Sequence, residues 1–310
     1  MNINLKNLIL KHLEEGEKIL VTGASGWLGR ETIELLAELL GNQFSSKVIL
    51  AGSTSRLIKV NKKNYSIVSL NSINENSFNF GIVLHLAFLS QDKVEQFGAK
   101  KYTNINDEIT NLMLHMVLAS GARYVFVASS GAAAANILEN QKHAGKKLYG
   151  ELKLQVENRF LALNSAQVLI GRIWSISGNQ IQEPLKYAIG NFIHQAIKTG
   201  TITLVGSAHS TRTYIDAKQM MTGYILQLLT SKDNLLDSGG TKTDLSGLAE
   251  QVLLKYNPSG LLVLSERWNL LPDYYVAPDN RMEKILNRYS VEPLSLDEQI
   301  ENTGHAIAFS

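Results

Sequence analysis

The feature that most constrains the fold is an apolar run that opens into a glycine-rich turn near the start of the chain. Residues 18–29 read Lys-Ile-Leu-Val-Thr-Gly-Ala-Ser-Gly-Trp-Leu-Gly. Residues 19–22 predict a buried strand, and the apolar pattern of residues 30–40 predicts a helix that stops at Gly41. A strand that passes through glycines onto a helix N-terminus gathers backbone N–H groups and the positive end of the helix dipole around one point. A pyrophosphate can approach that point because side chains are missing there.

This stretch therefore predicts a dinucleotide site, whereas a glycine-rich turn without a ligand is the alternative. The strand before the glycines and the amphipathic helix after them favour the dinucleotide. The cofactor-binding residues predicted from the turn itself are Gly23, Ser25, Gly26, Trp27, Leu28 and Gly29.

Strand-like and helical patterns alternate after the glycine turn. Short runs that are apolar on both faces occur at residues 48–51, 65–70, 82–87, 124–128 and 168–173, and helical patterns at 103–120 and 149–163. Such strands, separated by helices, are typical of a parallel sheet covered on both sides. We predict an α/β fold, with a doubly wound parallel Rossmann sheet as the dinucleotide-binding domain over residues 1–175. A smaller C-terminal α+β substrate lobe is expected over residues 176–310, with a soft boundary since later segments can return to the first domain.

The composition excludes several classes of protein. The chain of 310 residues has a formal net charge of +2 and no cysteine. This balance gives no electrostatic footprint for nucleic acid or a membrane surface, and disulfides, thiolate metal sites and cysteine nucleophiles are excluded. Residues 1–17 predict a short amphipathic helix rather than a signal sequence, and no apolar run of about 18 residues occurs. We expect a cytoplasmic protein with a small-molecule substrate. We expect no metal, because no His, Asp or Glu cluster has the spacing of metal ligands.

The end of the second strand predicts which dinucleotide binds. Residues 51–56 read Ala-Gly-Ser-Thr-Ser-Arg, with no acidic residue to accept hydrogen bonds from the adenosine ribose. Hydroxyl groups and a guanidinium suit a 2′-phosphate instead, because arginine offers a planar fork of donors. We predict that NADP(H) is preferred and that NAD(H) is possible, with Ser53 and Arg56 at this end of the cofactor. In the alternative interpretation Arg56 is a solvated surface charge and the site does not discriminate.

The candidate catalytic residues follow the fifth strand. That strand ends with Ser130, and residues 149–153 read Tyr-Gly-Glu-Leu-Lys. Tyr149 and Lys153 are four apart, so on a helix they lie on one face. A lysine ammonium favours the phenolate form of a nearby tyrosine, which can then move a proton to or from a sugar oxygen. A serine hydroxyl can hydrogen-bond the same oxygen and stabilise its developing charge.

A second Tyr-x-x-x-Lys occurs at Tyr214 and Lys218. Such a pair arises by chance about once in a chain with this many tyrosines and lysines. Tyr214 lies beyond the sixth strand and follows no strand-end serine. We therefore predict that Ser130, Tyr149 and Lys153 are catalytic and that the later pair is coincidental.

Taken together, these motifs resemble those of the extended short-chain dehydrogenase/reductase family, in its nucleotide-sugar epimerase/dehydratase branch, over nearly the whole chain. They are TGxxGxxG at residues 22–29, an HxAA-like run at 85–88, an NxxxTxNL-like run at 106–112, Ser-Ser-Gly at 129–131, YGxxK at 149–153 and GxxxxRxY before Tyr214. The resemblance implies that Ser130, Tyr149 and Lys153 are catalytic and that Lys153 also holds the nicotinamide ribose. It also implies that the cofactor is lined by Ala87, Phe88 and Asn104, and Leu70 is assigned to the same site.

For the substrate, the resemblance implies that Arg212 contacts the nucleotide diphosphate, with Asn191 near it and Ser130 on the sugar; a solvated loop charge is the alternative for Arg212. It also implies a homodimer through the helices that contain residues 112–118 and 152–163, although packing on the sheet would give the same apolar faces.

Departures from the family pattern narrow the chemistry. Gly131 and Ala132 stand where dehydratases carry an Asp-Glu pair, so 4,6-dehydration is not expected. Two reactions remain: an NADP(H)-dependent reduction of a nucleotide-linked 4-keto-6-deoxy sugar, which the predicted 2′-phosphate site favours, and an NAD-dependent 4-epimerisation. A catalytically silent NADP-binding regulatory protein is a third alternative, disfavoured because the tyrosine and the lysine are both present.

Overall fold

The computed structural model describes residues 4–73, 79–266 and 271–308. The chain divides into two compact units, and each is described by itself. The first unit comprises Met1–Ile173 and Met221–Leu236, and the second comprises Trp174–Met220 and Asp237–Ser310.

The first unit is built on a mostly parallel eight-stranded sheet in the order β11-β7-β6-β5-β1-β2-β4-β3. Parallel ladders join β1 to β2 and β5, β5 to β6, β6 to β7, and β2 to β4. The bounds are β1 Lys18–Thr22, β2 Val48–Gly52, β3 Arg56–Val60, β4 Lys63–Ser69, β5 Phe80–His85, β6 Tyr124–Ser130, β7 Gln167–Ile173 and β11 Leu235–Asp237. This confirms the doubly wound parallel sheet. The antiparallel edge strand β3 was not predicted, because residues 57–60 were assigned to no element.

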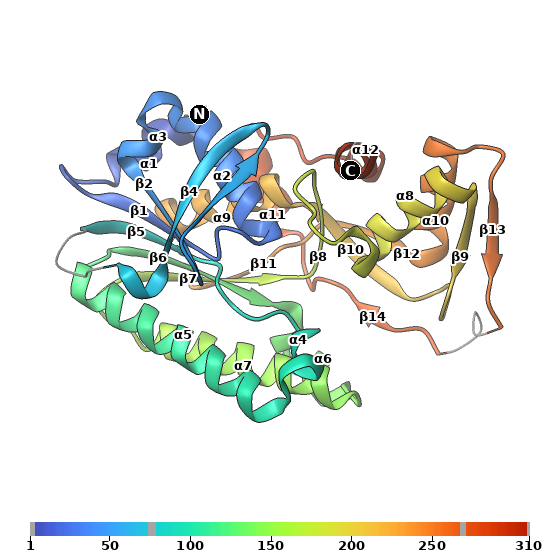
Figure 1. Ribbon diagram of the computed structural model, residues 1–310, viewed down its shortest axis with the longest axis horizontal. Helices are drawn as coiled ribbons and strands as arrows, with labels where there is room; N and C mark the ends of the chain where they lie inside the picture. Colours follow the sequence, from blue (N-terminus) through green and yellow to red (C-terminus); the bar gives the residue numbers. More distant parts are fainter. Residues whose placement is uncertain (1–3, 74–78, 267–270, 309–310) are drawn as a thin grey trace. The chain divides into compact units, whose positions relative to one another are not determined.

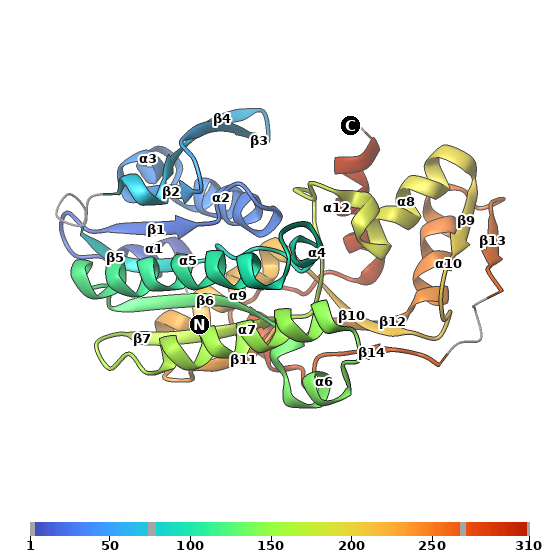
Figure 2. The same ribbon diagram turned by 60° about the horizontal axis from the view of Figure 1, so that its bottom comes forward.

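Helices cover both faces of this sheet, and the side chains of β6 show why. Val125 and Val127 point to one face, where they pack with Met113, Met116 and Phe160. These three belong to α5 (Ala99–Ser120) and α7 (Ala144–Leu161), which run side by side along that face in Figures 1 and 2. On the opposite face, the ring of Phe126 lies 4.8 Å from that of Tyr224 in α9 (Ala217–Thr230). A strand buried on both faces reads as a continuous apolar run, as the sequence does here.

The point where the winding reverses lies at β1, which has β2 on one side and β5 on the other. The glycine turn follows β1 and leads into α2 (Trp27–Leu40). In open parallel sheets, ligands bind outside the carboxyl ends of the strands at such a reversal. The remaining helices of this unit are α1 (Leu5–Lys11), α3 (Phe44–Lys47), α4 (Lys93–Phe97) and α6 (Ala135–Asn140).

The second unit is a smaller α+β arrangement. A four-stranded sheet joins β12 (Thr241–Asp244), β10 (Thr211–Asp216) and β14 (Tyr274–Tyr275), with β8 (Ser175–Ser177) also paired to β10. Strands β9 (Thr201–Leu204) and β13 (Leu261–Leu264) form a parallel pair. The helices are α8 (Ala188–Thr199), α10 (Leu245–Tyr256), α11 (Arg281–Arg288) and α12 (Leu296–Ala308). Throughout the described ranges of both units, we find no helix with the length and apolar character needed to cross a membrane.

Candidate active site

Glycine is suited to each of the three positions of the turn for a different physical reason. Gly23 has φ +66°, and a Cβ there would lie 2.8 Å from the backbone of Leu86 and Ala87. A Cβ on Gly29 would lie 2.3 Å from the carbonyl oxygen of Gly23, so this glycine lets α2 pack closely on the turn. A Cβ on Gly26 would meet only an ordinary contact of 3.5 Å. The first and third glycines thus serve packing, whereas the missing side chain of Gly26 leaves room for a ligand.

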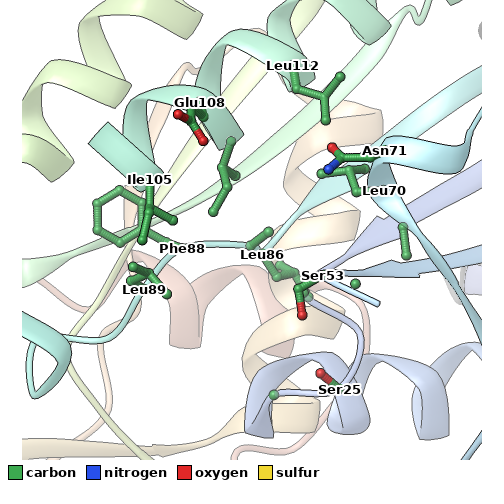
Figure 3. Close-up of a pocket in the computed structure, with 16 residues that line it drawn as sticks. Ser25, Ser53, Leu70, Asn71, Leu86, Phe88, Leu89, Ile105, Glu108 and Leu112 are labelled. Carbon is green, nitrogen blue, oxygen red and sulfur yellow. The ribbon is translucent and has the colours of Figure 1, made fainter. Parts of the chain in front are cut away.

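A cavity of about 590 Å³ opens beside Gly26, at the carboxyl ends of β1, β2 and β5 (Figure 3). The predicted cofactor residues that line it are Gly23, Ser25, Gly26, Ser53, Leu70, Ala87 and Phe88. The sequence interpretation missed a wall of α5, formed by Ile105, Glu108, Ile109 and Leu112, together with Ala51, Gly52, Asn71, Leu86 and Leu89. The repeat of apolar residues along α5 was the available signal, but it was assigned only to helix packing. The glycine cradle and this apolar wall fit an adenine dinucleotide.

Other residues predicted for the cofactor do not line this cavity. The indole of Trp27 is buried and donates to Glu31 Oε1 at 3.2 Å, and Leu28 is half-buried in the first turn of α2. Asn104 is exposed on α5 and lines a separate hollow of about 420 Å³ beside residues 97–101. Its role at the cofactor stays a prediction.

Two arginines converge on Ser25 at the edge of the glycine turn. Arg56 Nη2 donates to Ser25 Oγ at 2.5 Å, and Arg30 Nε donates to the Ser25 carbonyl oxygen at 3.2 Å. Burial, followed by the charge of Arg56, lowers the pKa of Arg30 below its ordinary value. Two guanidinium groups therefore lie near one another beside Ser25, and an anion close to both would relieve their repulsion.

The segment after β5 is fastened to β1 by Thr22. The hydroxyl of Thr22 accepts hydrogen bonds from Leu86 N at 3.2 Å and Ala87 N at 3.3 Å, and it lies 2.9 Å from His85 Nδ1. Because the hydroxyl oxygen accepts from both amides, we assign the hydroxyl as the donor to Nδ1. Nδ1 therefore carries no hydrogen, and the imidazole hydrogen is on Nε2. Burial, with a smaller effect of Lys153, lowers the pKa of His85 to about 3. His85 is therefore neutral, and the network fixes the backbone that carries Ala87 and Phe88.

The three candidate catalytic residues lie in the first unit, on β6 and α7. Ser130 is the last residue of β6, and its Oγ accepts from Ala132 N at 3.2 Å. Tyr149 and Lys153 are one turn apart on α7. A Cβ on Gly150 would lie 2.4 Å from the carbonyl oxygen of Ala132, so this glycine allows α7 to approach the turn that follows Ser130. The glycine after the tyrosine thus brings Tyr149 toward the strand-end serine.

Lys153 is held in a buried position. Its Nζ donates to the carbonyl oxygen of Ala128 at 2.8 Å, and it lies 3.9 Å from the ring centroid of Phe88 and 5.9 Å from that of Tyr149. Burial lowers the pKa of Lys153 to about 7, although the charge of Glu157 opposes this shift. The ammonium and the neutral amine are therefore both accessible near neutral pH.

Glu157 lies one turn further along α7, in a buried network that sequence reasoning did not find. Its carboxylate accepts from Ser129 Oγ at 2.5 Å and from Arg172 through Nε at 2.9 Å and Nη2 at 2.7 Å. The first serine of the Ser-Ser pair is thus engaged with Glu157. Ser130 is accordingly the better candidate for contact with a substrate.

The predicted substrate residues Asn191 and Arg212 belong to the second unit. Arg212 pairs with Asp273 Oδ2 at 2.8 Å and donates to the carbonyl oxygens of Asp273 and Thr211. It is therefore ion-paired rather than a solvated loop charge. Asn191 lies on α8, where its Oδ1 accepts from Gln195 Nε2 at 2.8 Å. Their contacts with a substrate stay predictions.

The structure separates the second Tyr-x-x-x-Lys pair. Tyr214 lies on strand β10 and Lys218 in the first turn of α9, so the two do not share one face of a helix. Burial raises the pKa of Tyr214 to about 12. Among the residues that the structure describes, no group of three or more His, Cys, Asp or Glu side chains could hold a metal ion.

A doubly wound sheet, a glycine turn at its winding reversal and a cavity beside that turn define the Rossmann class of nucleotide-binding folds. More specifically, the chain belongs to the NAD dependent epimerase/dehydratase family, whose model matches residues 19–236. No curated protein matches the sequence.

Solved structures share the fold at low identity. A UDP-N-acetylglucosamine 4-epimerase from Methanobrevibacter ruminantium M1, in complex with UDP-N-acetylmuramic acid, has a TM-score of 0.75 at 17% identity, covering 96% of this chain and 99% of the other. The NAD dependent NDP-hexosamine 5,6-dehydratase TunA has a TM-score of 0.73 at 13% identity, covering 95% and 98%. A UDP-glucuronic acid 4-epimerase from Bacillus cereus, in complex with UDP-glucuronic acid and NAD, has a TM-score of 0.72 at 15% identity, covering 94% and 99%.

Proposed function

We propose that the protein is an NADP(H)-dependent oxidoreductase that reduces a nucleotide-linked 4-keto-6-deoxy sugar. The observation that carries the choice of cofactor is the hydrogen bond from Arg56 to Ser25. It sets a guanidinium beside Ser25, which lines the cavity, and residues 51–56 offer no acidic side chain. A 2′-phosphate would find a bidentate donor there, and no carboxylate would repel it.

In this proposal Gly23, Ser25 and Gly26 hold the pyrophosphate, while Ser53 and Arg56 hold the phosphorylated ribose. When bound, the reduced nicotinamide supplies a hydride to C4 of the sugar. Tyr149 donates a proton to the C4 oxygen, so the carbonyl becomes a hydroxyl and the charge balances. Ser130 hydrogen-bonds that oxygen as charge builds on it, and Lys153, with its pKa of about 7, returns a proton to Tyr149.

Recognition of the substrate is proposed for the second unit. Arg212 carries the donors that a nucleoside diphosphate needs, with Asn191 as a further polar contact. Two of the structurally similar proteins are described with bound UDP-linked sugars, which supports this class of substrate.

NAD-dependent 4-epimerisation is the second candidate, because those two similar structures are 4-epimerases. An epimerase oxidises C4 and returns the same hydride to the other face, so it keeps its cofactor and consumes none. Dehydration is not proposed, because Gly131 and Ala132 follow Ser130 and carry no side chain that could act as an acid or a base.

The two reactions are separated by the fate of the cofactor. Purified protein would be incubated with NADPH or NADH and a panel of nucleoside diphosphate 4-keto-6-deoxyhexoses, and oxidation of the cofactor followed at 340 nm. We expect stoichiometric use of NADPH and a 4-hydroxy product. Interconversion of UDP-hexoses without added cofactor, by protein that retains NAD through purification, would instead establish the epimerase.

We also propose a homodimer that uses the outer face of α5 and α7. Leu118 on α5 is 57% exposed and Leu161 on α7 is 38% exposed, although both continue the apolar patterns of their helices. Light scattering after size-exclusion chromatography should give twice the mass of 34.3 kDa, and L118E/L161E should give the monomer mass.

A further inference from the structure

Phe88 lies between the cavity and the buried lysine. Its ring lines the cavity, and the ring centroid is 3.9 Å from Lys153 Nζ. Lys153 itself is 5% exposed and is absent from the cavity lining, as are Tyr149 and Ser130. Figure 3 shows Phe88 beside Leu89 and Ile105, across the cavity from Ser25. The cavity therefore ends at the phenyl ring, and the ammonium lies behind it.

The backbone on both sides of Phe88 is fixed. Ala87 N donates to Thr22, and Leu89 N donates to Asn106 Oδ1 at 2.9 Å. The carbonyl oxygen of Leu89 also accepts from the buried hydroxyl of Tyr102 at 2.7 Å. Because these bonds hold the chain, rotation of the side chain is the way by which Phe88 can uncover Lys153.

The ring also has favourable contacts in its present position. Its edge-to-face partners are Tyr149, with centroids 5.9 Å apart, and Tyr102, at 6.4 Å. Over the ammonium it supplies a cation–π contact, which is strongest where water is excluded. The contact replaces part of the hydration that burial removes from Lys153. The phenyl ring thus holds the closed arrangement in the absence of a ligand.

We propose that Phe88 is a positioning residue that gates the nicotinamide end of the site. The adenosine and phosphate groups would enter the open cavity first, and the nicotinamide riboside would reach Lys153 only after the ring has turned aside. This inference rests on the proposed function, since it takes Lys153 to meet the nicotinamide half of the cofactor. The closed ring lowers the apparent affinity for the whole dinucleotide but not for its adenosine half.

The test compares F88A with L89A. Leu89 also lines the cavity, so L89A enlarges it without removing the ring that covers Lys153. Calorimetry would measure binding of NADPH and of 2′-phospho-ADP-ribose to each protein. We expect F88A to bind NADPH about tenfold more tightly than the unsubstituted protein, with faster association in stopped flow. Binding of 2′-phospho-ADP-ribose should be unchanged in F88A, which also shows that the variant is folded, and L89A should show no gain for NADPH.

Equal or weaker binding of NADPH by F88A would overturn the gate, as would an equal gain in L89A. A second measurement needs no cofactor: modification of Lys153 by trinitrobenzenesulfonate, located by peptide mass spectrometry. It should be several-fold faster in F88A than in L89A, and equal rates would contradict the covering role of the ring. If the unsubstituted protein and both variants bind neither NADPH nor its fragment, the proposed cofactor is wrong, and the labelling result still decides whether Phe88 covers Lys153.

Discussion

Two Tyr-x-x-x-Lys segments occur in this chain with the same spacing and with different surroundings. Tyr149 and Lys153 lie on one helix, α7, with the tyrosine half-buried and the lysine buried against β6 and Phe88. Tyr214 is buried on strand β10, and Lys218 lies in the first turn of the helix that follows, α9. The comparison shows that i,i+4 spacing brings two side chains together only when both residues lie on one helix, because one helical turn places them next to each other on the same face.

The contacts around Tyr149 and Lys153 also differ from those around Tyr214. Gly150 lets α7 approach the turn after Ser130, and the bond from Lys153 to Ala128 ties the helix to the strand. Tyr214 lacks these features, and burial raises its pKa to about 12. Such a phenol is a poor proton donor at neutral pH. Matched substitutions at the two segments should therefore have different effects.

The largest difference is expected for removal of the phenolic hydroxyl. Y149F should lower turnover by about 10²- to 10⁴-fold, the usual contribution of a general acid, with cofactor affinity unchanged. Y214F should leave turnover within about twofold. The measurement is NADPH oxidation with a nucleotide-linked 4-keto sugar, with cofactor binding followed by calorimetry. Comparable losses in the two variants would remove the distinction between the pairs.

Substitution of Lys153, but not of Lys218, should affect both activity and stability. Because burial lowers the pKa of Lys153 to about 7, the unfolded chain binds a proton that the native state has lost between about pH 7 and the ordinary lysine pKa near 10. Stability should therefore rise with pH across this window, and below it the buried ammonium costs on the order of a few kcal/mol. The K153M variant should lose turnover and should have a higher melting temperature at pH 7. Its stability should also rise less with pH above about pH 7. K218M should do none of these, and a matching stability change there would argue against the role of burial.

The sequence predicted the first unit well because its signals are local. Buried parallel strands read as apolar runs, and the strand order agrees with the predicted parallel sheet. A glycine turn after the first strand indicates where a dinucleotide binds, and a cavity lies beside that turn. Phe88 shows what stayed hidden, since its contact with Lys153 joins residues 65 apart in the chain and no periodicity reports it. The role of Gly150 was likewise invisible without knowing that Ala132 lies against it. In the second unit the strands are short and paired across long separations, so residue roles there came only from the family resemblance.

The guanidinium of Arg56 beside Ser25, at the edge of the cavity, gives a prediction about the proposed cofactor. R56A should lower affinity for NADPH by about ten- to a hundredfold and leave affinity for NADH within about twofold, because the guanidinium would act on the 2′-phosphate alone. The neighbouring K59A is a matched control, since Lys59 is an exposed cation on the same strand. Isothermal titration calorimetry with NADPH and with NADH measures the ratio of the two affinities for each variant. An equal loss for NADH and NADPH would show that Arg56 holds the pyrophosphate or the turn itself rather than selecting the cofactor.

The smallest effect is expected at His85. This residue should influence stability at acidic pH, whereas Lys153 should influence stability at alkaline pH. Burial lowers the pKa of His85 to about 3, so between about pH 6.5 and pH 3 the unfolded chain binds a proton that the native state does not. Stability should therefore fall as the pH is lowered through this window, by about 1 kcal/mol between pH 6.5 and 5.5.

H85N keeps an acceptor for the Thr22 hydroxyl but cannot titrate, so its slope in chemical denaturation should be flatter over this range. Its stability at pH 7 should be lower, because the imidazole that packs against Phe160 is lost. H115N, at an exposed position on α5, should keep the original slope. If H85N keeps that slope too, the acid sensitivity belongs to other groups, and the neutral histidine beneath Ala87 and Phe88 does not limit the stability of the site.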